Sequence, residues 1–280
     1  MMGLARMPGF LYYPLKMRTS RTLNVLAGLF ALLLLLAALP VRADDSRIIT
    51  ILSRRGVPVS FYYMTQDKAR ATLVLLPGGK GDIKLRDGTP ESDDFLVRSR
   101  GYFFANGFNV VVVNKPDDVE ELNFRARTSF RHTEDIKQIT AYVKEDSRLP
   151  VWLIGTSRGT ISATAAAIAM TPDSLSGIVL TSSITSPVTP GAVPSQNLAK
   201  IRIPVLVVHH EDDSCRICDP DDVPEIMQGL CNSPVKKAVL VKGGWWARGR
   251  ACGPRHYHSY IGMEKKVAAL ISQWIQNPAL

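Results

Sequence analysis

The chain has 280 residues, of which 46% are hydrophobic and 21% are charged, and its formal net charge at pH 7 is +9. Five basic residues and no acidic residue fall within residues 1–43, so the remaining 237 residues carry only +4. No block of Lys and Arg interleaved with aromatic residues remains there, which excludes nucleic acid as an expected partner. The length suits one large domain, and no repeat or low-complexity tract divides it.

The N-terminus has the pattern of a secretory signal peptide. Arg18 and Arg21 precede an uncharged apolar stretch at 23–39, and small residues follow up to Ala43. We therefore predict a signal peptide at 1–43, with Met17 as a possible true start, and export to the periplasm or the extracellular space. The alternative is an uncleaved membrane anchor, because 17 apolar residues are at the lower edge of a spanning length. In that case only this segment would contact a membrane.

Short apolar runs alternate with helical patterns along residues 44–280, which we expect to form a single domain. Runs without polar interruption are typical of parallel strands that are covered on both faces, so the pattern predicts an α/β fold with a mostly parallel sheet. The expected strands are 48–52 and 57–64, as an antiparallel pair, then 72–76, 109–113, 151–154, 177–180, 205–209 and 238–241. The expected helices are 93–106, 128–146, 159–170, 221–230 and 262–276.

A glycine-rich turn follows the strand expected at 72–76. Its sequence, Pro-Gly-Gly-Lys-Gly-Asp at 77–82, lets the backbone approach a bound ligand closely. The G-x-x-x-x-G-K-[ST] spacing of a phosphate-binding loop is absent. Among the backbone N–H groups of this turn, we take that of Gly79 as the first candidate for an oxyanion donor and that of Lys80 as the second.

The most informative stretch is 151–159, where an apolar run ends at Gly155-Thr156-Ser157-Arg158-Gly159. This G-x-S-x-G pattern, between a predicted strand and an Ala-rich predicted helix, indicates a nucleophile elbow that presents the Ser157 hydroxyl at a sharp turn. The Arg158 N–H would be the second oxyanion donor. The alternative is a glycine-flanked turn serine with no chemistry.

Acidic residues follow the later strand at 205–209. Because ligands bind at the carboxyl ends of parallel strands, these carboxylates are placed to orient a catalytic histidine. We favour Asp213, with Asp212 as the near alternative, since one residue of register decides which side chain points inward. A solvated acidic loop is the plain alternative. His209 and His210, at the strand end, are expected to pack or to form supporting hydrogen bonds.

The candidate base comes from the C-terminal part of the chain. Only His256 and His258 lie between the last predicted strand and the closing helix, where the order Ser, acid, His places the base. We favour His258, and His256 remains the alternative. His132 lies in a polar helical segment and is expected on the surface.

These motifs together resemble the α/β-hydrolase superfamily, over essentially all of residues 44–280. The resemblance implies an eight-stranded, mostly parallel sheet with helices on both faces, and a Ser157, Asp213, His258 triad for hydrolysis at a carbonyl. It implies no metal and no organic cofactor. Its residues are the 77–81 loop, the 155–159 elbow, the 209–213 strand end and His258 before the closing helix.

The sequence departs from this family in two places. Pro77 stands in the oxyanion loop where many relatives have His, which matters little because backbone N–H groups perform the role. The segment between Leu180 and Ile203 is too short for a large cap domain, which predicts an open site.

Four cysteines lie in the last third of the chain, and in an exported protein they favour disulfides. The loops that carry the acid and the base must meet, so we predict a Cys215–Cys252 bond, which leaves Cys218 with Cys231. The alternatives are a Cys-x-x-Cys redox pair and a four-cysteine zinc site; the first lacks a thioredoxin-like context and the second lacks another Cys-x-x-Cys.

The sequence therefore predicts an exported serine hydrolase that acts on small soluble carboxylic esters. The alternatives are a peptidase or amidase of the same fold and a catalytically silent binding protein. Arg158 and Lys80 would place positive charge at the rim of the site and favour a carboxylate-bearing substrate, unless they are solvated surface residues. Trp245 and Trp246 would either wall a pocket or pack against the sheet edge.

Overall fold

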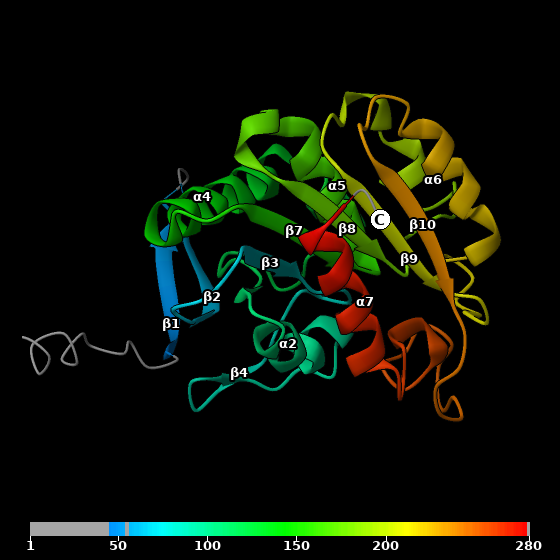
Figure 1. Cartoon of the computed structure of the whole chain (residues 1–280), viewed down its shortest axis with the longest axis horizontal. Helices are drawn as coiled ribbons and strands as arrows, with labels where there is room; N and C mark the ends of the chain where they lie inside the picture. The colour runs from blue at the N-terminus through cyan, green and yellow to red at the C-terminus, as the bar shows by residue number, and fades with distance from the viewer. Residues whose placement is uncertain (1–44, 54–55, 279–280) are drawn as a thin grey trace, which may run out of the picture. The chain divides into compact units, whose positions relative to one another are not determined.

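The computed structural model describes residues 45–53 and 56–278. An eight-stranded sheet forms the centre of this part of the chain (Figure 1). Its strand order is β1-β2-β6-β3-β7-β8-β9-β10; β1 and β6 run antiparallel to β2, and the pairs from β6 to β10 are parallel. The strands are β1 (Asp45–Leu52), β2 (Pro58–Thr65), β3 (Thr72–Leu76), β6 (Asn109–Val113), β7 (Val151–Thr156), β8 (Gly177–Thr181), β9 (Val205–His210) and β10 (Lys236–Val241). A small hairpin, β4 (Leu85–Arg86) with β5 (Thr89–Pro90), stands apart.

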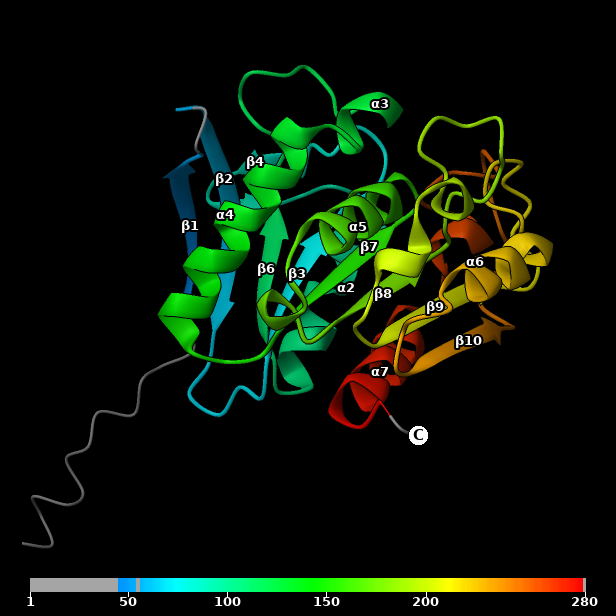
Figure 2. The same ribbon diagram turned by 90° about the horizontal axis from the view of Figure 1, so that it is seen from above.

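Helices cover both faces of the sheet (Figure 2). Every residue of β3, β6, β7, β8 and β9 is buried, so alternate side chains of these strands pack into two separate cores. One core contains α4, α5 and α6, and the other contains α2 and α7. The helices are α2 (Phe95–Ala105), α3 (Phe124–Arg127), α4 (Phe130–Ser147), α5 (Arg158–Ala169), α6 (Val223–Gly229) and α7 (Glu264–Gln276).

Capping side chains explain where two of these helices begin. The Asp94 carboxylate accepts a hydrogen bond from Leu96 N at 2.9 Å, and the Ser129 hydroxyl accepts one from His132 N at 3.3 Å. At its other end α4 stops at Arg148, whose backbone is left-handed. The mostly parallel sheet with helices on both faces confirms the fold that the alternating pattern predicted.

The structure corrects one expectation about α4. His132 was expected on the surface, but it is buried, and its Nε2 shares a hydrogen bond of 2.9 Å with the Ser162 hydroxyl of α5. Several other polar residues of α4 are also buried, and sequence pattern does not distinguish them from exposed ones.

Only short 3-10 helices interrupt the segment between β8 and β9, at Val193–Ser195 and Leu198–Lys200, so no large cap is present there. Among the described helices, none combines the length and the apolar character required to cross a membrane. The predicted signal peptide at 1–43 lies outside the described residues.

Candidate active site

Ser157 sits at the sharp turn between β7 and α5. Its backbone has φ 51° and ψ −124°, a conformation that costs energy for a residue with a Cβ. Ser157 occupies the N-cap position of α5, yet its side chain makes no capping hydrogen bond. The turn therefore holds the hydroxyl away from the helix backbone, where it is free to react.

The two glycines of the motif are required by contacts across the turn. A Cβ on Gly159 would lie 1.9 Å from the carbonyl oxygen of Leu76 in β3, and one on Gly155 would lie 2.5 Å from the carbonyl oxygen of Gly159. Both distances are far below van der Waals contact and involve backbone atoms, which cannot move aside cheaply. The G-x-S-x-G spacing thus packs α5 directly onto β3 and β7.

Asp213 and His258 meet beneath this turn, although they come from separate loops. Asp213 follows β9, and its Oδ2 accepts a hydrogen bond of 2.8 Å from His258 Nδ1, while its Oδ1 accepts one of 3.0 Å from Cys215 N. Both side chains are buried. Asp212 is exposed, and neither Asp212 nor His256 enters the pair. The structure thus brings together the favoured acid and base.

The other ring nitrogen of His258, Nε2, is not bound by Asp213. Because a carboxylate only accepts hydrogen bonds, Nδ1 carries the proton and Nε2 presents a lone pair. Nε2 is buried and has no hydrogen-bond partner among the described residues. A buried polar atom of this kind is costly unless it finds a donor. A serine hydroxyl brought to Nε2 would satisfy it and give up its proton there.

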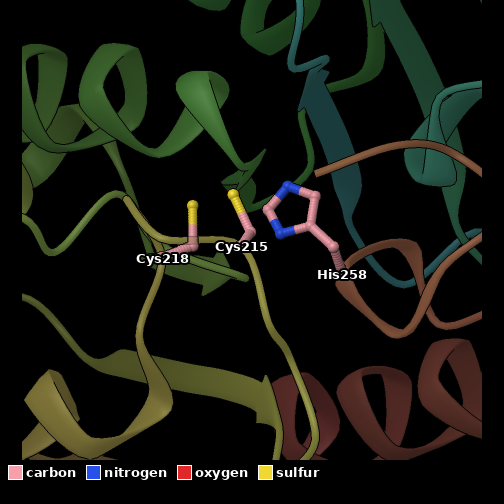
Figure 3. A group of neighbouring side chains, drawn as sticks. All are labelled: Cys215, Cys218 and His258. Atoms are coloured by element: carbon pink, nitrogen blue, oxygen red, sulfur yellow. The ribbon is translucent and has the colours of Figure 1, made fainter. Parts of the chain in front are cut away.

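The Cys218 thiol connects Ser157 with His258. Burial and the Asp213 carboxylate raise the pKa of this thiol well above its usual value, and a hydrogen bond with the Ser157 hydroxyl opposes that rise. The Cys218 Sγ also lies within 4.8 Å of a ring nitrogen of His258 (Figure 3). Ser157 and His258 therefore both lie close to the Cys218 thiol.

The candidate oxyanion loop lies against the elbow. A Cβ on Gly78 would be 3.0 Å from Ser157 Cβ, and the Gly78 N–H is already donated to the Asp94 carboxylate at 2.8 Å. Gly79, the next residue, has φ +52°, and its N–H has no acceptor in the described part of the chain. The Arg158 N–H begins α5 and has no acceptor within the helix. The Lys80 N–H, the second candidate, likewise has no acceptor in the described part of the chain, and the Lys80 side chain pairs with Glu121 at 3.8 Å.

Arg127 binds the carbonyl oxygens of this loop, a role that the sequence did not indicate. Its Nη2 lies 3.2–3.3 Å from the carbonyl oxygens of Pro77, Gly78 and Gly79, and its Nη1 donates to Ser162 at 3.0 Å. Burial, together with the charge of Arg158, lowers the pKa of Arg127 to about 9, so it stays cationic at neutral pH. Three carbonyls of the loop are thus held by one cation, which fixes the backbone around Gly79.

One of the two predicted disulfides is present. Cys215 and Cys252 form a disulfide that joins the loop after β9 to the loop before His258. Cys218 and Cys231, which were expected to pair, are free: Cys218 is buried beside Ser157, and Cys231 is exposed beyond the end of α6. The nearby group Cys215, Cys218 and His258 does not make a metal site, because the Cys215 sulfur is in the disulfide and Asp213 occupies His258 Nδ1 (Figure 3).

The two histidines at the end of β9 support the site. His209 Nε2 accepts a hydrogen bond from Ser183 N at 2.6 Å, and burial lowers the pKa of His209 to about 4, so it is neutral at physiological pH. His210 Nδ1 accepts from Asp212 N at 3.0 Å, and its ring stacks on Tyr257 at 4.6 Å between centroids. His210 thereby turns the Asp212 backbone and leaves the next residue, Asp213, to face His258.

A mostly parallel sheet with a serine elbow after β7, an acid after β9 and a histidine after β10 has the arrangement of an α/β hydrolase, and the chain has the α/β-hydrolase fold. No protein-family model and no curated protein sequence matches the chain. Solved structures do match it. A dienelactone hydrolase from Anabaena variabilis is 16% identical, with a TM-score of 0.60 over 83% of this chain and 97% of that chain.

Two further solved structures show the same fold. An esterase from Pyrococcus furiosus is 10% identical, with a TM-score of 0.61 over 84% of this chain and 91% of that one. A putative α/β hydrolase from Agrobacterium tumefaciens is 13% identical, with a TM-score of 0.56 over 82% of this chain and 95% of that one. At these identities the likeness establishes the fold, and the activity must be argued from the residues.

Proposed function

We propose that the protein is an exported serine hydrolase that cleaves small carboxylic esters through Ser157, His258 and Asp213. The observation that carries the proposal is the buried, unpartnered Nε2 of His258, whose Nδ1 is held by Asp213 at 2.8 Å beside a serine in an elbow. A base oriented in this way has one function that follows from its geometry, which is to take a proton from a neighbouring hydroxyl.

In the proposed reaction, Ser157 Oγ attacks the ester carbonyl while His258 Nε2 takes its proton. The Gly79 and Arg158 N–H groups bind the oxyanion, and Asp213 stabilises the imidazolium that forms. His258 then protonates the leaving alcohol. A water, activated by the same histidine, hydrolyses the acyl-enzyme and restores Ser157.

Two features support export. The N-terminal pattern at 1–43 is that of a signal peptide, and a structural disulfide of the Cys215–Cys252 kind is typical of oxidising compartments. The printed names of structural neighbours include an esterase and a dienelactone hydrolase, which agrees with an ester as substrate. A puromycin hydrolase also shares the fold, over 40% of its own chain. Because a peptidase or amidase of the same fold is the alternative, the test includes amides.

A fluorophosphonate probe tests the nucleophile. We expect the intact protein to be labelled and the Ser157→Ala variant to remain unlabelled. A folded protein that takes no label would reject the serine-hydrolase function and favour a silent binding protein. A panel of short acyl esters and aminoacyl amides then separates the remaining alternatives, and faster turnover of the amides would replace the esterase proposal with a peptidase or amidase.

A further inference from the structure

A cleft of about 770 Å³ lies between the start of α2 and the long loop after β10. This volume is typical of small-molecule sites. We call it the Trp-Arg cleft, and the lining residues that matter here are Asp93, Arg98, Trp245, Trp246, Arg248 and Arg255. None of these residues belongs to the proposed catalytic machinery.

Two indole rings form the apolar part of the cleft. Trp245 N donates to the Ile261 carbonyl at 3.0 Å, and its ring lies over Gly262, where a Cβ would be only 2.5 Å from the ring. Trp245 is therefore fixed by its surroundings, yet it is 70% exposed, and Trp246 is 85% exposed. Exposed, positioned indoles offer flat apolar faces that a ring-bearing ligand would cover.

The charge in the cleft is positive and partly unpaired. Arg98 is engaged, since it donates to the Pro254 and Ser259 carbonyls at 3.1 Å and pairs with Glu264 at 2.9 Å. In contrast, no ion pair or side-chain hydrogen bond joins Arg248 or Arg255 to another described residue. Their backbones are linked, because Arg248 N donates to the Arg255 carbonyl at 2.9 Å. Two guanidinium groups that line one cleft without a partner suit a carboxylate or phosphate group.

On each wall of the cleft, a lining residue is close in the chain to a residue of the site. Asp93 precedes Asp94, whose carboxylate holds the Gly78 N–H of the oxyanion loop at 2.8 Å. On the opposite wall, Arg255 lies three residues before His258. The positive charge that the sequence suggested at Arg158 and Lys80 is already engaged, since Arg158 lies 4.4 Å over the Phe124 ring and Lys80 pairs with Glu121.

We propose that the Trp-Arg cleft binds an anionic, ring-bearing part of the substrate, so that the preferred esters carry a carboxylate or phosphate on an aromatic or similarly flat apolar body. The ring stacks on the indoles, and the anion is bound by Arg248 and Arg255. The assignment of this ligand to the substrate rests on the proposed ester hydrolysis, whereas binding to the cleft does not require it.

Binding is tested without chemistry in the Ser157→Ala protein. We expect saturable binding of 2-naphthoate by calorimetry, with quenching of tryptophan emission, and binding of the neutral 2-naphthamide weaker by about ten-fold, as loss of a hydrogen bond to a charged group implies. Arg248→Gln and Arg255→Gln should weaken naphthoate binding by about as much. Trp245→Ala should reduce the quenching, and Trp246 accounts for what remains. Arg131→Gln, which removes an exposed arginine from α4, serves as the charge-matched control and should change nothing.

Turnover is tested with 4-carboxyphenyl acetate against 4-carbamoylphenyl acetate. We expect the intact protein to favour the anionic ester in kcat/KM, and Arg255→Gln to remove that preference by lowering kcat/KM for the anionic ester. Naphthoate binding without turnover of any ester supports the cleft and rejects the hydrolase function. Equal turnover of both esters with no naphthoate binding overturns the cleft and leaves the function standing. Adsorption to phosphatidylglycerol vesicles that Trp246→Ala abolishes, without naphthoate binding, also overturns the proposal, because the indoles would then serve a membrane surface.

Discussion

At the scale of single residues, neighbours in the sequence have opposite environments. Asp213 is buried against His258, whereas Asp212 is exposed, and the difference comes from His210, which accepts the Asp212 N–H and fixes the turn after β9. Sequence reasoning could narrow the acid to these two residues because both follow a strand. It could not decide between them with certainty, since the deciding hydrogen bond lies within the loop.

Asp212 and Asp213 offer a matched test of which carboxylate orients His258. Asp213→Asn should lower kcat for a short ester by about 10⁴-fold, because an amide at this position stabilises the wrong histidine tautomer. Asp212→Asn, one residue away, should leave kcat within about two-fold, since an exposed side chain without a role contributes little. Steady-state kinetics on the two variants is the measurement. Equal losses in both would contradict the assignment of Asp213.

Arg127 is the clearest residue that sequence reasoning missed. Nothing in the pattern around it distinguishes it from its exposed neighbour Arg125, and only the fold brings it to the carbonyls of the oxyanion loop. We expect Arg127→Lys to lower kcat by about 10²-fold with KM nearly unchanged, since a displaced oxyanion donor affects the transition state more than the bound substrate.

The control for this prediction is Arg125→Lys, which should leave both constants unchanged. Circular dichroism and thermal unfolding would establish that Arg127→Lys remains folded. A variant that is folded and raises KM while keeping kcat would contradict the positioning role, because it would place Arg127 in substrate binding instead.

At the scale of elements, the loops after β9 and β10 act as one unit. Each carries one half of the Asp213–His258 pair, and the Cys215–Cys252 disulfide joins them. That these loops meet could be expected from the chain order of acid and base. That Cys218 and Cys231 remain unpaired, one buried and one exposed, could not be expected. It depends on which face of a short irregular segment each cysteine occupies.

Removal of this disulfide should destabilise the protein and slow it. The bond closes a segment with a sequence separation of 37, and the loop-entropy relation then gives a loss of roughly 4 kcal/mol in the free energy of unfolding. We expect the double variant Cys215→Ala/Cys252→Ala to show this loss in urea denaturation and a lower kcat at temperatures where it is folded. Cys231→Ser, which removes an exposed free thiol, is the control. Unchanged unfolding of the double variant would contradict a structural role for the bond.

At the scale of the whole molecule, the order of most strands and helices was predictable, as was the antiparallel pairing of the first two strands, but the pairing of the other strands was not. Apolar runs such as 109–113 and 151–154 are recognisable because both faces of each strand are buried. The placement of β6 between β2 and β3 depends on long-range contacts that no local pattern contains. The same limit applies to the Trp-Arg cleft, whose walls are more than a hundred residues apart in the chain.

The buried neutral His209 makes the stability of the whole fold depend on pH. Its pKa is about 4 in the folded protein against 6.5 for the free side chain, so between these values the unfolded chain binds a proton that the folded chain does not. The contribution, about 3 kcal/mol, is fully present above pH about 6.5 and is lost as pH falls toward 4.

Urea denaturation at a series of pH values measures this dependence. The free energy of unfolding should fall across that window in the intact protein, and the slope should be smaller by about one proton in His209→Gln. The variant will also lower stability at neutral pH, so the comparison is between slopes. An unchanged slope would show that His209 is not the group that titrates.

The rate at which the buried Cys218 thiol reacts with a reagent in solution should report how often the catalytic loops open. A thiol reagent in solution reaches exposed Cys231 directly, whereas it reaches Cys218 only when the loop after β9 separates from Ser157. Labelling of the native protein should therefore proceed in a fast phase and a slow phase, and the Cys231→Ser variant should retain only the slow one. A ligand that closes the site would slow that phase further, so its rate would report occupancy for substrates that carry no chromophore.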